Sequence, residues 1–399
     1  MKIPDKKIRA YALKNAVAYG GRANQGAVIS ALFHEGMKKD EIKNYAKLVA
    51  EIVKEVNSIS IEEQEKEFKK LEKDISHREE REGLPELPSV SKSGVIMRSA
   101  PSASGALHLF HGINIALSFN YVKKYGGKLY IRIEDTNPEN IDEKAYGMIK
   151  KDAEWLTKGR AIVAVQSDSM QKYYDYAEKL IKKSSAYVCT CSSEKFKKFA
   201  DFRENCPCRN NDSKENLLRW KKMLDKNGYK EGNAVLRFKS NMQDPNPAMR
   251  DFPLARINET NHPRQKNKYK VWPLMNLAVS VDDIEMKMTH IIRGKDHRDN
   301  AKRQEMIFKA LGKKYPWVGF LGRYHFKDME ISTSKFRQGI EKGIYSGWDD
   351  PKLPTLISLR NRGYKPEAFW KIAEHIGLSE VDKIADSKEF FGLLGRFNK

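Results

Sequence analysis

A chain of 399 residues is longer than one typical domain core and predicts two to four structural units. Its 74 lysine and arginine residues outnumber 53 aspartate and glutamate residues, and the net charge of +21 favours a polyanionic partner, although a general lysine bias would look the same. No apolar run reaches the ~18 residues that span a bilayer, and the N-terminal segment lacks the apolar core of a signal peptide. We therefore expect a cytoplasmic protein without a membrane partner.

The first 88 residues predict an N-terminal helical appendage. Apolar residues recur at helical spacing around Ile8 and again around Val49, and residues 58–74 form a highly charged helical stretch. Two prolines in residues 80–90 predict a linker. This part carries no catalytic pattern, so a contact with a partner and a solvated helical platform both stay open.

Residues 98–112, RSAPSASGALHLFHG, combine a strand exit, a turn and a helix start. Residues 95–98 predict a short buried strand, residues 101–105 a turn, and residues 111–125 a helix. Unpaired backbone N–H groups and the helix dipole make such a corner suitable for phosphate. His108 and His111 would project from one side of the first turn. Ordinary packing or surface positions are the alternative for the two histidines.

A strand at residues 129–133 would complete a strand–helix–strand unit of a nucleotide-binding sheet, followed by helices at residues 144–156 and 173–183. All four cysteines then fall within twenty positions, as the pairs Cys189/Cys191 and Cys206/Cys208. In a reducing compartment this grouping favours metal ligation over disulfides, and Zn²⁺ accepts four thiolates. Four ordinary thiols are the alternative. The sheet is expected to resume near residues 269–271 and to run to residue 322, with helices at 366–377 and 387–397.

Several segments, in order, resemble archaeal glutamyl-tRNA synthetases, which are class I aminoacyl-tRNA synthetases. They are RSAPSASGALHLFHG, YIRIEDTNP (130–138), WPLMNLAVSVDD (272–283), THIIRGKDH (289–297), ISTSKFRQGI (331–340) and GWDDPKLPTL (347–356). The resemblance implies an α/β fold with a Rossmann-like parallel sheet. Its halves would be residues 89–185 and 264–322, interrupted by a zinc-bearing acceptor-stem domain at 186–263 and followed by a helical stem-contact region at 323–399.

The resemblance also implies roles for single residues. His108, His111 and Lys335 would act in catalysis, and Gly105, Phe110, Ser332 and Ser334 would join Lys335 around ATP, whose phosphates would hold Mg²⁺. Arg98 and Arg293 would bind the substrate carboxylate, with ion pairing inside the protein as their alternative, and Glu134 would engage the amino group. Cys189, Cys191, Cys206 and Cys208 would hold a structural Zn²⁺.

Three positions depart from the family pattern. Phe110 replaces a glycine that lies close to the nucleotide, so its ring must stack on ATP, rotate away or block the site. Met275 replaces a tyrosine and Val279 a small polar residue, and each loses a hydrogen-bonding group from the amino-acid pocket.

For Asp282 and Asp283, a helix cap or a ribose contact is favoured over a metal site.

The expected function is therefore ATP-dependent activation of glutamate and its transfer to the acceptor end of tRNA(Glu), with no role for DNA. The family continues into β-barrels that read the anticodon, and the chain ends before them, so we expect either a separate anticodon-binding chain or a protein that does not read the anticodon. A catalytically degenerate tRNA-binding paralogue, and an enzyme acting on glutamine or a modified tRNA nucleoside, are the alternatives.

Overall fold

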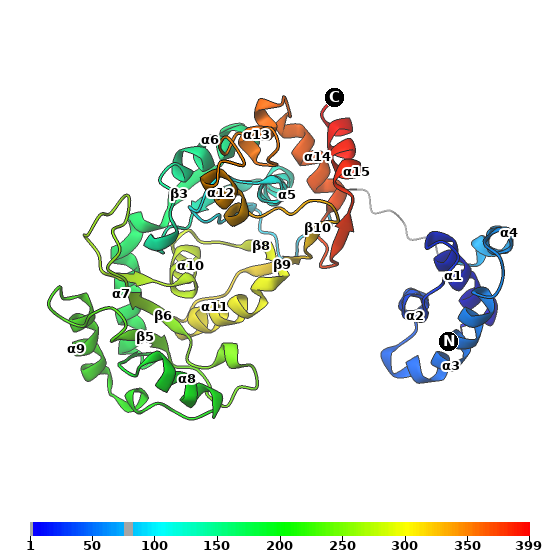
Figure 1. The fold of residues 1–399 in the computed structure, drawn as a ribbon. Helices are drawn as coiled ribbons and strands as arrows, with labels where there is room; N and C mark the ends of the chain where they lie inside the picture. The colour runs from blue at the N-terminus through cyan, green and yellow to red at the C-terminus, as the bar shows by residue number, and fades with distance from the viewer. Residues whose placement is uncertain (1–2, 76–82) are drawn as a thin grey trace. The chain divides into compact units, whose positions relative to one another are not determined.

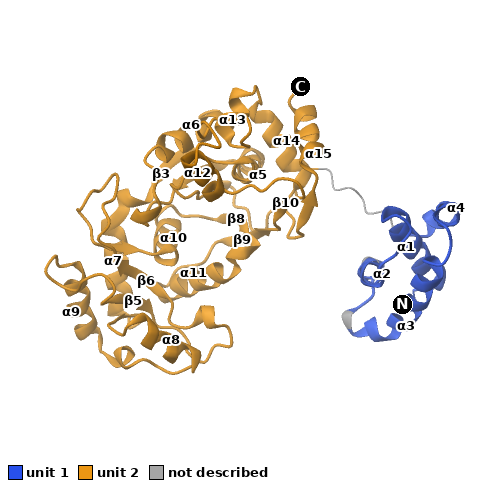
Figure 2. Cartoon of the chain, viewed as in Figure 1, with its two compact units in different colours: residues 1–82 blue, residues 83–399 orange. Residues whose placement is uncertain are grey.

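The computed structural model describes residues 3–75 and 83–399, which fall into two compact units, residues 1–82 and 83–399 (Figure 2). The sequence predicted a first unit extending to residue 88. Residues 83–88 instead belong to the second unit and are not helical, because Leu87 is buried in the core of that unit. The first part of the predicted linker, residues 80–82, lies outside the described residues.

The first unit is a bundle of short helices, as its sequence predicted. They are α1 (Asp5–Ala18), α2 (Gln25–Leu32), α3 (Ile42–Val56) and α4 (Ile61–Leu71). Helix α1 contacts the other three, and its Ile8 and Leu13 meet Val49 of α3 in a common apolar core. The side-chain amide of buried Gln64 donates hydrogen bonds to backbone carbonyls of Gly21 and Val56, which fastens α4 to the bundle.

The centre of the second unit is a parallel sheet of β1 (Val95–Ser99), β2 (Gly127–Ile133) and β3 (Ile162–Val165), in that order. Helices α5 (Leu109–Tyr125) and α6 (Ala145–Thr157) connect its strands (Figure 1). A second parallel pair, β8 (His290–Gly294) and β9 (Trp317–Leu321), lies beside β1, because Thr289 and Ile96 exchange hydrogen bonds. The predicted strand–helix–strand unit is confirmed, and the exits of β1 and β8 lie close together.

An antiparallel sheet is inserted in the sequence between β3 and β8. It consists of β4 (Ala186–Cys189), β5 (Val235–Phe238), β6 (Pro253–Ile257) and β7 (Val271–Pro273), flanked by α7 (Met170–Lys182), α8 (Ser193–Asp201) and α9 (Ser213–Leu224). The sequence assigned residues 269–271 to the parallel sheet, and this was wrong. Val271 pairs with Ile257 of β6, and an apolar strand does not reveal its pairing partner by its own pattern.

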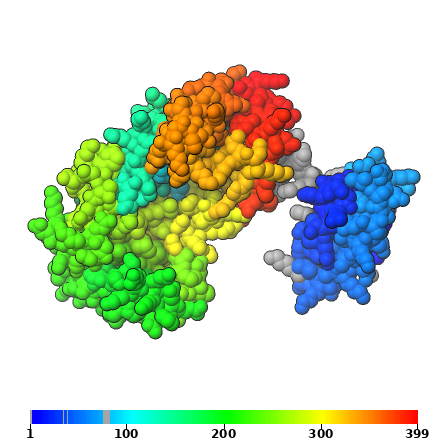
Figure 3. Space-filling view, viewed as in Figure 1, coloured from blue at the N-terminus to red at the C-terminus, as the bar shows by residue number. Residues whose placement is uncertain are grey.

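Helices α10 (Met275–Glu285) and α11 (Arg298–Ala310) complete the central part, and the C-terminal part packs on α5. Its elements are β10 (Tyr324–Phe326), α12 (Thr333–Glu341), α13 (Leu356–Asn361), α14 (Pro366–Ile376), β11 (Lys383–Ala385) and α15 (Ser387–Phe397). Figure 3 shows the residues around 350, in orange, at the surface of this unit. Within residues 3–75 and 83–399, no helix combines the length and apolar character needed to cross a membrane.

A buried carboxylate on α6 predicts a pH dependence of stability. Asp152 accepts a hydrogen bond at 3.0 Å from Nη1 of Arg360 on α13, and burial, partly offset by Arg360, raises the pKa of Asp152 to about 7. Because the folded-state pKa lies above the unfolded one, the stabilisation from this group is complete below about pH 4 and lost as the pH rises through about 7. We expect Asp152→Asn to flatten the fall in unfolding free energy between about pH 4 and 7 in urea titrations. Glu154→Gln, at an exposed position on the same helix, is the control and should keep the pH dependence of the wild type. If the unfolding free energy of Asp152→Asn falls with pH as steeply as that of the control, the assignment is contradicted.

Candidate active site

His108 and His111 lie together at the start of α5, as the sequence predicted. His108 is the N-cap residue, and the two imidazole rings stack with centroids 3.7 Å apart at an interplanar angle of 19°. The backbone N–H of His108 donates to Nδ1 of His111 at 3.2 Å. Burial lowers the pKa of His111 to about 4 and that of His108 well below its usual value. Both rings are therefore neutral at pH 7, and His111, whose Nδ1 accepts, carries its proton on Nε2 as a free donor.

The turn before α5 and the start of α12 line one cavity of about 310 Å³. Its walls include His108, His111, Gly105 and Ser332. The guanidinium of Arg337 on α12 donates to the carbonyl oxygen of Ser104, which ties the two segments together across the cavity. Two segments more than 200 residues apart in sequence thus form one polar site.

Lys335 lies in the first turn of α12. Ser332 is the N-cap residue, and its hydroxyl accepts from the backbone N–H of Lys335 at 3.5 Å, so the serine closes the helix start. The Lys335 ammonium is exposed and pairs with Glu330, and Ser334 is exposed as well. The predicted phosphate-binding lysine is therefore at the surface beside the cavity.

Gly105 is required by a protein contact. Its φ is +153°, and an added Cβ would lie 2.4 Å from Cη2 of Trp348. Trp348 donates from Nε1 to Asp142 at 3.0 Å, so its ring is held against the turn. The sequence linked Gly105 to ATP and did not identify Trp348, although Trp348 lies within the GWDDPKLPTL segment.

The Phe110 ring lies between His108 and the C-terminal part, and its centroid is 6.3 Å from that of His108 in an edge-on contact. It packs on Tyr324, Phe326 and Phe390, with ring centroids 5.6, 5.5 and 6.5 Å away. Phe110 also lines a second cavity of about 720 Å³, together with Gly294 and Leu321 at the ends of β8 and β9. The ring is held by these aromatic neighbours and faces the larger cavity, and which of the three outcomes applies to bound ATP stays a prediction.

Replacing Phe110 by glycine should therefore cost stability without unmasking activity. Loss of a half-buried phenyl ring and the low helix propensity of glycine predict a fall of about 2–3 kcal/mol in the unfolding free energy. We expect no gain in ATP–pyrophosphate exchange. Thermal unfolding and exchange kinetics of Phe110→Gly, with Phe110→Leu as the volume control, measure both effects, and faster exchange by the glycine variant would identify an occluded nucleotide site.

Arg98 is committed to an internal ion pair. Its Nε and Nη2 donate to the two oxygens of Asp283 at 3.0 and 3.1 Å, and both side chains are buried. Arg132, fully buried on β2, donates from Nη1 to the same Asp283 at 2.6 Å and lies 3.4 Å from Asp282. The helix-cap interpretation of Asp282 and Asp283 was wrong, because both lie inside α10, where Asp283 accepts from the two arginines and Asp282 accepts from the Tyr173 hydroxyl. The sequence missed Arg132, although a charged residue inside an apolar strand signals a buried partner.

Arg293, at the exit of β8, differs from Arg98. It is 8% exposed and donates from Nη1 to Oε1 of Gln304 at 2.8 Å, while its Nε is buried without a hydrogen-bond partner. No carboxylate in residues 3–75 or 83–399 forms an ion pair with it. Burial and the neighbouring Arg98 charge lower the pKa of Arg293. A buried guanidinium without a counter-ion is suited to an anionic ligand.

The remaining residues predicted to bind the amino acid differ in their burial and contacts. Glu134 lies at the end of β2 with its carboxylate 3.5 Å from Nη2 of Arg132. Val279 is buried in α10, whereas Met275, in the first turn of α10, is 39% exposed. Met275 is therefore at the surface of α10 and Val279 inside the protein, and their part in an amino-acid pocket stays a prediction.

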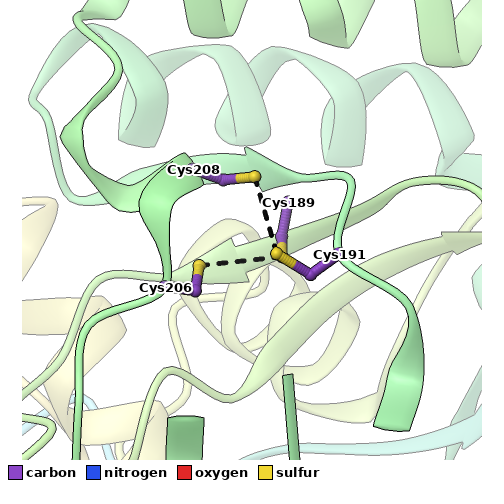
Figure 4. Close-up of side chains that lie close together, drawn as sticks. All are labelled: Cys189, Cys191, Cys206 and Cys208. Atoms are coloured by element: carbon purple, nitrogen blue, oxygen red, sulfur yellow. Dashed lines mark hydrogen bonds between the residues drawn. The ribbon is translucent and has the colours of Figure 1, made fainter. Parts of the chain in front are cut away.

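The four cysteines converge at one end of the antiparallel sheet (Figure 4). Their sulfur atoms all lie within 4.8 Å of one another, with Cys189 and Cys206 3.8 Å apart and Cys191 and Cys208 3.9 Å apart. Four sulfurs at about 2.3 Å from one Zn²⁺ would be roughly 3.8 Å apart at tetrahedral angles. The cluster therefore fits a tetrathiolate metal site.

Comparison with known proteins agrees with this geometry. The family model described as "tRNA synthetases class I (E and Q), catalytic domain" matches residues 94–391. The glutamate–tRNA ligase of Methanothermobacter thermautotrophicus is 43% identical over 389 residues, covering 96% of this chain and 69% of that protein. The glutamate–tRNA ligase of Methanocaldococcus jannaschii is 42% identical over 379 residues, covering 95% and 68%. A crystal structure of a glutamate tRNA ligase from Elizabethkingia meningosepticum shares the fold, with a TM-score of 0.51 and 22% identity over 70% of this chain and 60% of that one.

Proposed function

Because this chain belongs to the class I tRNA synthetase family for glutamate and glutamine, we propose that it activates glutamate with ATP and transfers the glutamyl group to the 3′ end of tRNA(Glu). The cavity of about 310 Å³ carries this proposal. It brings the neutral donors of His108 and His111 next to the start of α12, where Lys335 lies. An anionic triphosphate fits a site made of N–H donors, a helix start and a nearby ammonium.

The first reaction needs no protein nucleophile. A carboxylate oxygen of glutamate attacks the α-phosphorus of ATP, the bond to the bridging oxygen breaks, and pyrophosphate leaves from the opposite side. Positioning and charge stabilisation supply the catalysis. His108 and His111 would donate hydrogen bonds to the phosphate oxygens, and Lys335 would leave Glu330 to neutralise the departing pyrophosphate. Mg²⁺ would be held mainly by the phosphates.

Arg293 is the group best suited to the side-chain carboxylate of glutamate. Its guanidinium is buried and lacks a counter-ion, whereas Arg98 is already paired with Asp283. Arg98, through its ion pair with Asp283, would then stabilise the wall of the pocket. Its positive charge would also attract the glutamate side-chain carboxylate without contacting it. Glu134 at the end of β2 would receive the amino group. A single strong cation for the carboxylate favours glutamate over glutamine.

The cysteine cluster would hold a structural Zn²⁺ in the domain that receives the tRNA acceptor stem. The ion would link the end of β4 to the loop at Cys206 and Cys208, in a small cluster that also contains Tyr187 and Phe196. That cluster is separate from the core around β1 and α5.

Removal of the metal should therefore act locally. We expect a chelator to abolish binding of an acceptor-stem RNA before the near-ultraviolet circular dichroism signal of the whole chain is lost. RNA binding is measured by fluorescence anisotropy. Zinc added back should restore binding. Loss of RNA binding and of the core signal at the same chelator concentration would contradict a separate role for this domain.

The decisive experiment is tRNA-dependent ATP–pyrophosphate exchange with glutamate and, in parallel, with glutamine. We expect exchange with glutamate, and an added anticodon-binding chain tests whether a second polypeptide contributes. Exchange with glutamine alone would support shifted specificity. Intact tRNA binding without exchange under any of these conditions would eliminate the enzymatic function and leave a tRNA-binding protein.

A further inference from the structure

A tetrathiolate zinc centre would carry a formal charge of about −2 in a largely buried place, so its sulfurs need donors and cations nearby. Cys208 has two candidate donors on one residue, because the backbone nitrogen and the hydroxyl of Thr190 lie 3.4 and 3.5 Å from its sulfur. Arg237, stacked over the Phe196 ring at 3.3 Å, supplies positive charge beside Cys189.

Cys206 has backbone donors in Cys208 and Arg209, and the hydroxyl of Tyr187 is a further side-chain donor beside its sulfur. The hydroxyl oxygen lies 3.5 Å from the Cys206 sulfur and 2.8 Å from Oδ2 of Asp251. Tyr187 is fully buried on β4, two residues before Cys189. A phenol has one proton, so it donates either to the carboxylate or to the sulfur at any moment.

Asp251, which accepts the hydrogen bond from this hydroxyl, is itself held in a fixed position. It is fully buried and has a φ of +28°, a strained conformation for a residue with a Cβ. Its carboxylate accepts from Nε of Arg209 at 2.9 Å and from the backbone N–H of Ser240 at 2.7 Å, besides Tyr187. Asp251 therefore keeps two strong donors when the tyrosine proton turns elsewhere.

We propose that Tyr187, held in place by Asp251, is a positioning residue of the metal site, whose hydroxyl turns its proton from Asp251 to the Cys206 sulfur when that thiolate binds the metal. The hydrogen bond partly neutralises the sulfur, fixes its direction and slows metal loss. This inference depends on the proposed zinc site.

The test compares Tyr187→Phe with Tyr174→Phe in the full-length protein. Tyr174 is a matched control, since its hydroxyl donates at 2.7 Å to the carbonyl of Val271 in the same sheet and does not contact the cysteines. The readouts are the rate of zinc transfer to a chromogenic chelator and the thiolate-to-metal absorption of the Co²⁺-substituted protein. We expect Tyr187→Phe to lose zinc about 10- to 100-fold faster and to shift the Co²⁺ absorption, with the control unchanged.

The outcomes separate this inference from the function on which it depends. A wild-type chain that binds neither Zn²⁺ nor Co²⁺ overturns the metal site itself, and with it the role of Tyr187. A wild-type chain that binds metal, with Tyr187→Phe losing it at the wild-type rate, overturns only the role of Tyr187. Equal acceleration in both variants also overturns it, because it would reflect a loosened sheet.

Discussion

Replacing Arg293 by methionine is expected to lower kcat/KM for glutamate by about 100- to 1,000-fold, equivalent to about 3–4 kcal/mol of lost charge-assisted hydrogen bonding. The same change should raise the melting temperature by about 1–3 °C, because it removes a buried charge that has no counter-ion. Gln304 keeps a donor in the variant, since the Tyr315 hydroxyl lies 3.2 Å from its Oε1. Pyrophosphate exchange kinetics and thermal unfolding measure the two effects.

Arg98→Met is the informative comparison. It leaves Asp283 with Arg132 as its remaining guanidinium partner, so we expect a loss of about 2–3 kcal/mol in the free energy of unfolding. The two variants should therefore change stability in opposite directions. Destabilisation of similar size in both would contradict the different roles assigned to the two arginines.

Lys335→Ala is expected to lower kcat for tRNA-dependent pyrophosphate exchange by about 100- to 1,000-fold, because it removes a positive charge from the leaving pyrophosphate. KM for glutamate should change less than about 2-fold, since a group that acts on the transition state changes kcat rather than substrate binding. The melting temperature should stay within about 1 °C, because the exposed pair with Glu330 contributes little stability.

Lys342→Ala is the matched control for that change. Lys342 is an exposed lysine that follows the last residue of the same helix, α12. Its replacement should leave exchange unchanged. If both lysine variants lose activity equally, the effect comes from the net charge of α12, and the assignment of Lys335 to the phosphates fails.

Local patterns predicted the elements of the fold better than their pairing. Strand β1, helix α5 and helix α15 lie close to their predicted positions, because apolar spacing and turn residues determine such elements locally. The pairing of β7 was missed, because it depends on Ile257 and its neighbours in another segment. The end of the first unit was missed for a similar reason, since Leu87 is buried by residues far along the chain.

In the candidate site, too, local features could be predicted from the sequence and long-range contacts could not. The stacking of His108 on His111 follows from their three-residue spacing at a helix start, and the convergence of the cysteines follows from their paired spacing. The difference between Arg98 and Arg293 could not be predicted, because it depends on which side chain reaches Asp283. Gly105 was recognised as special, but the partner that requires it, Trp348, is more than 200 residues away.

The pairing of β7 has a practical consequence for shortening this chain. One residue, Leu274, separates β7 from α10, and its backbone N–H donates to the carbonyl of Leu254 in β6 at 2.8 Å. Deleting residues 186–263 would leave the edge of β7 without its partner, and the buried Val271 and Trp272 would face solvent. A minimal version of the parallel-sheet core therefore needs both cuts outside β4 and β7, with a designed turn leading from α7 into the start of α10.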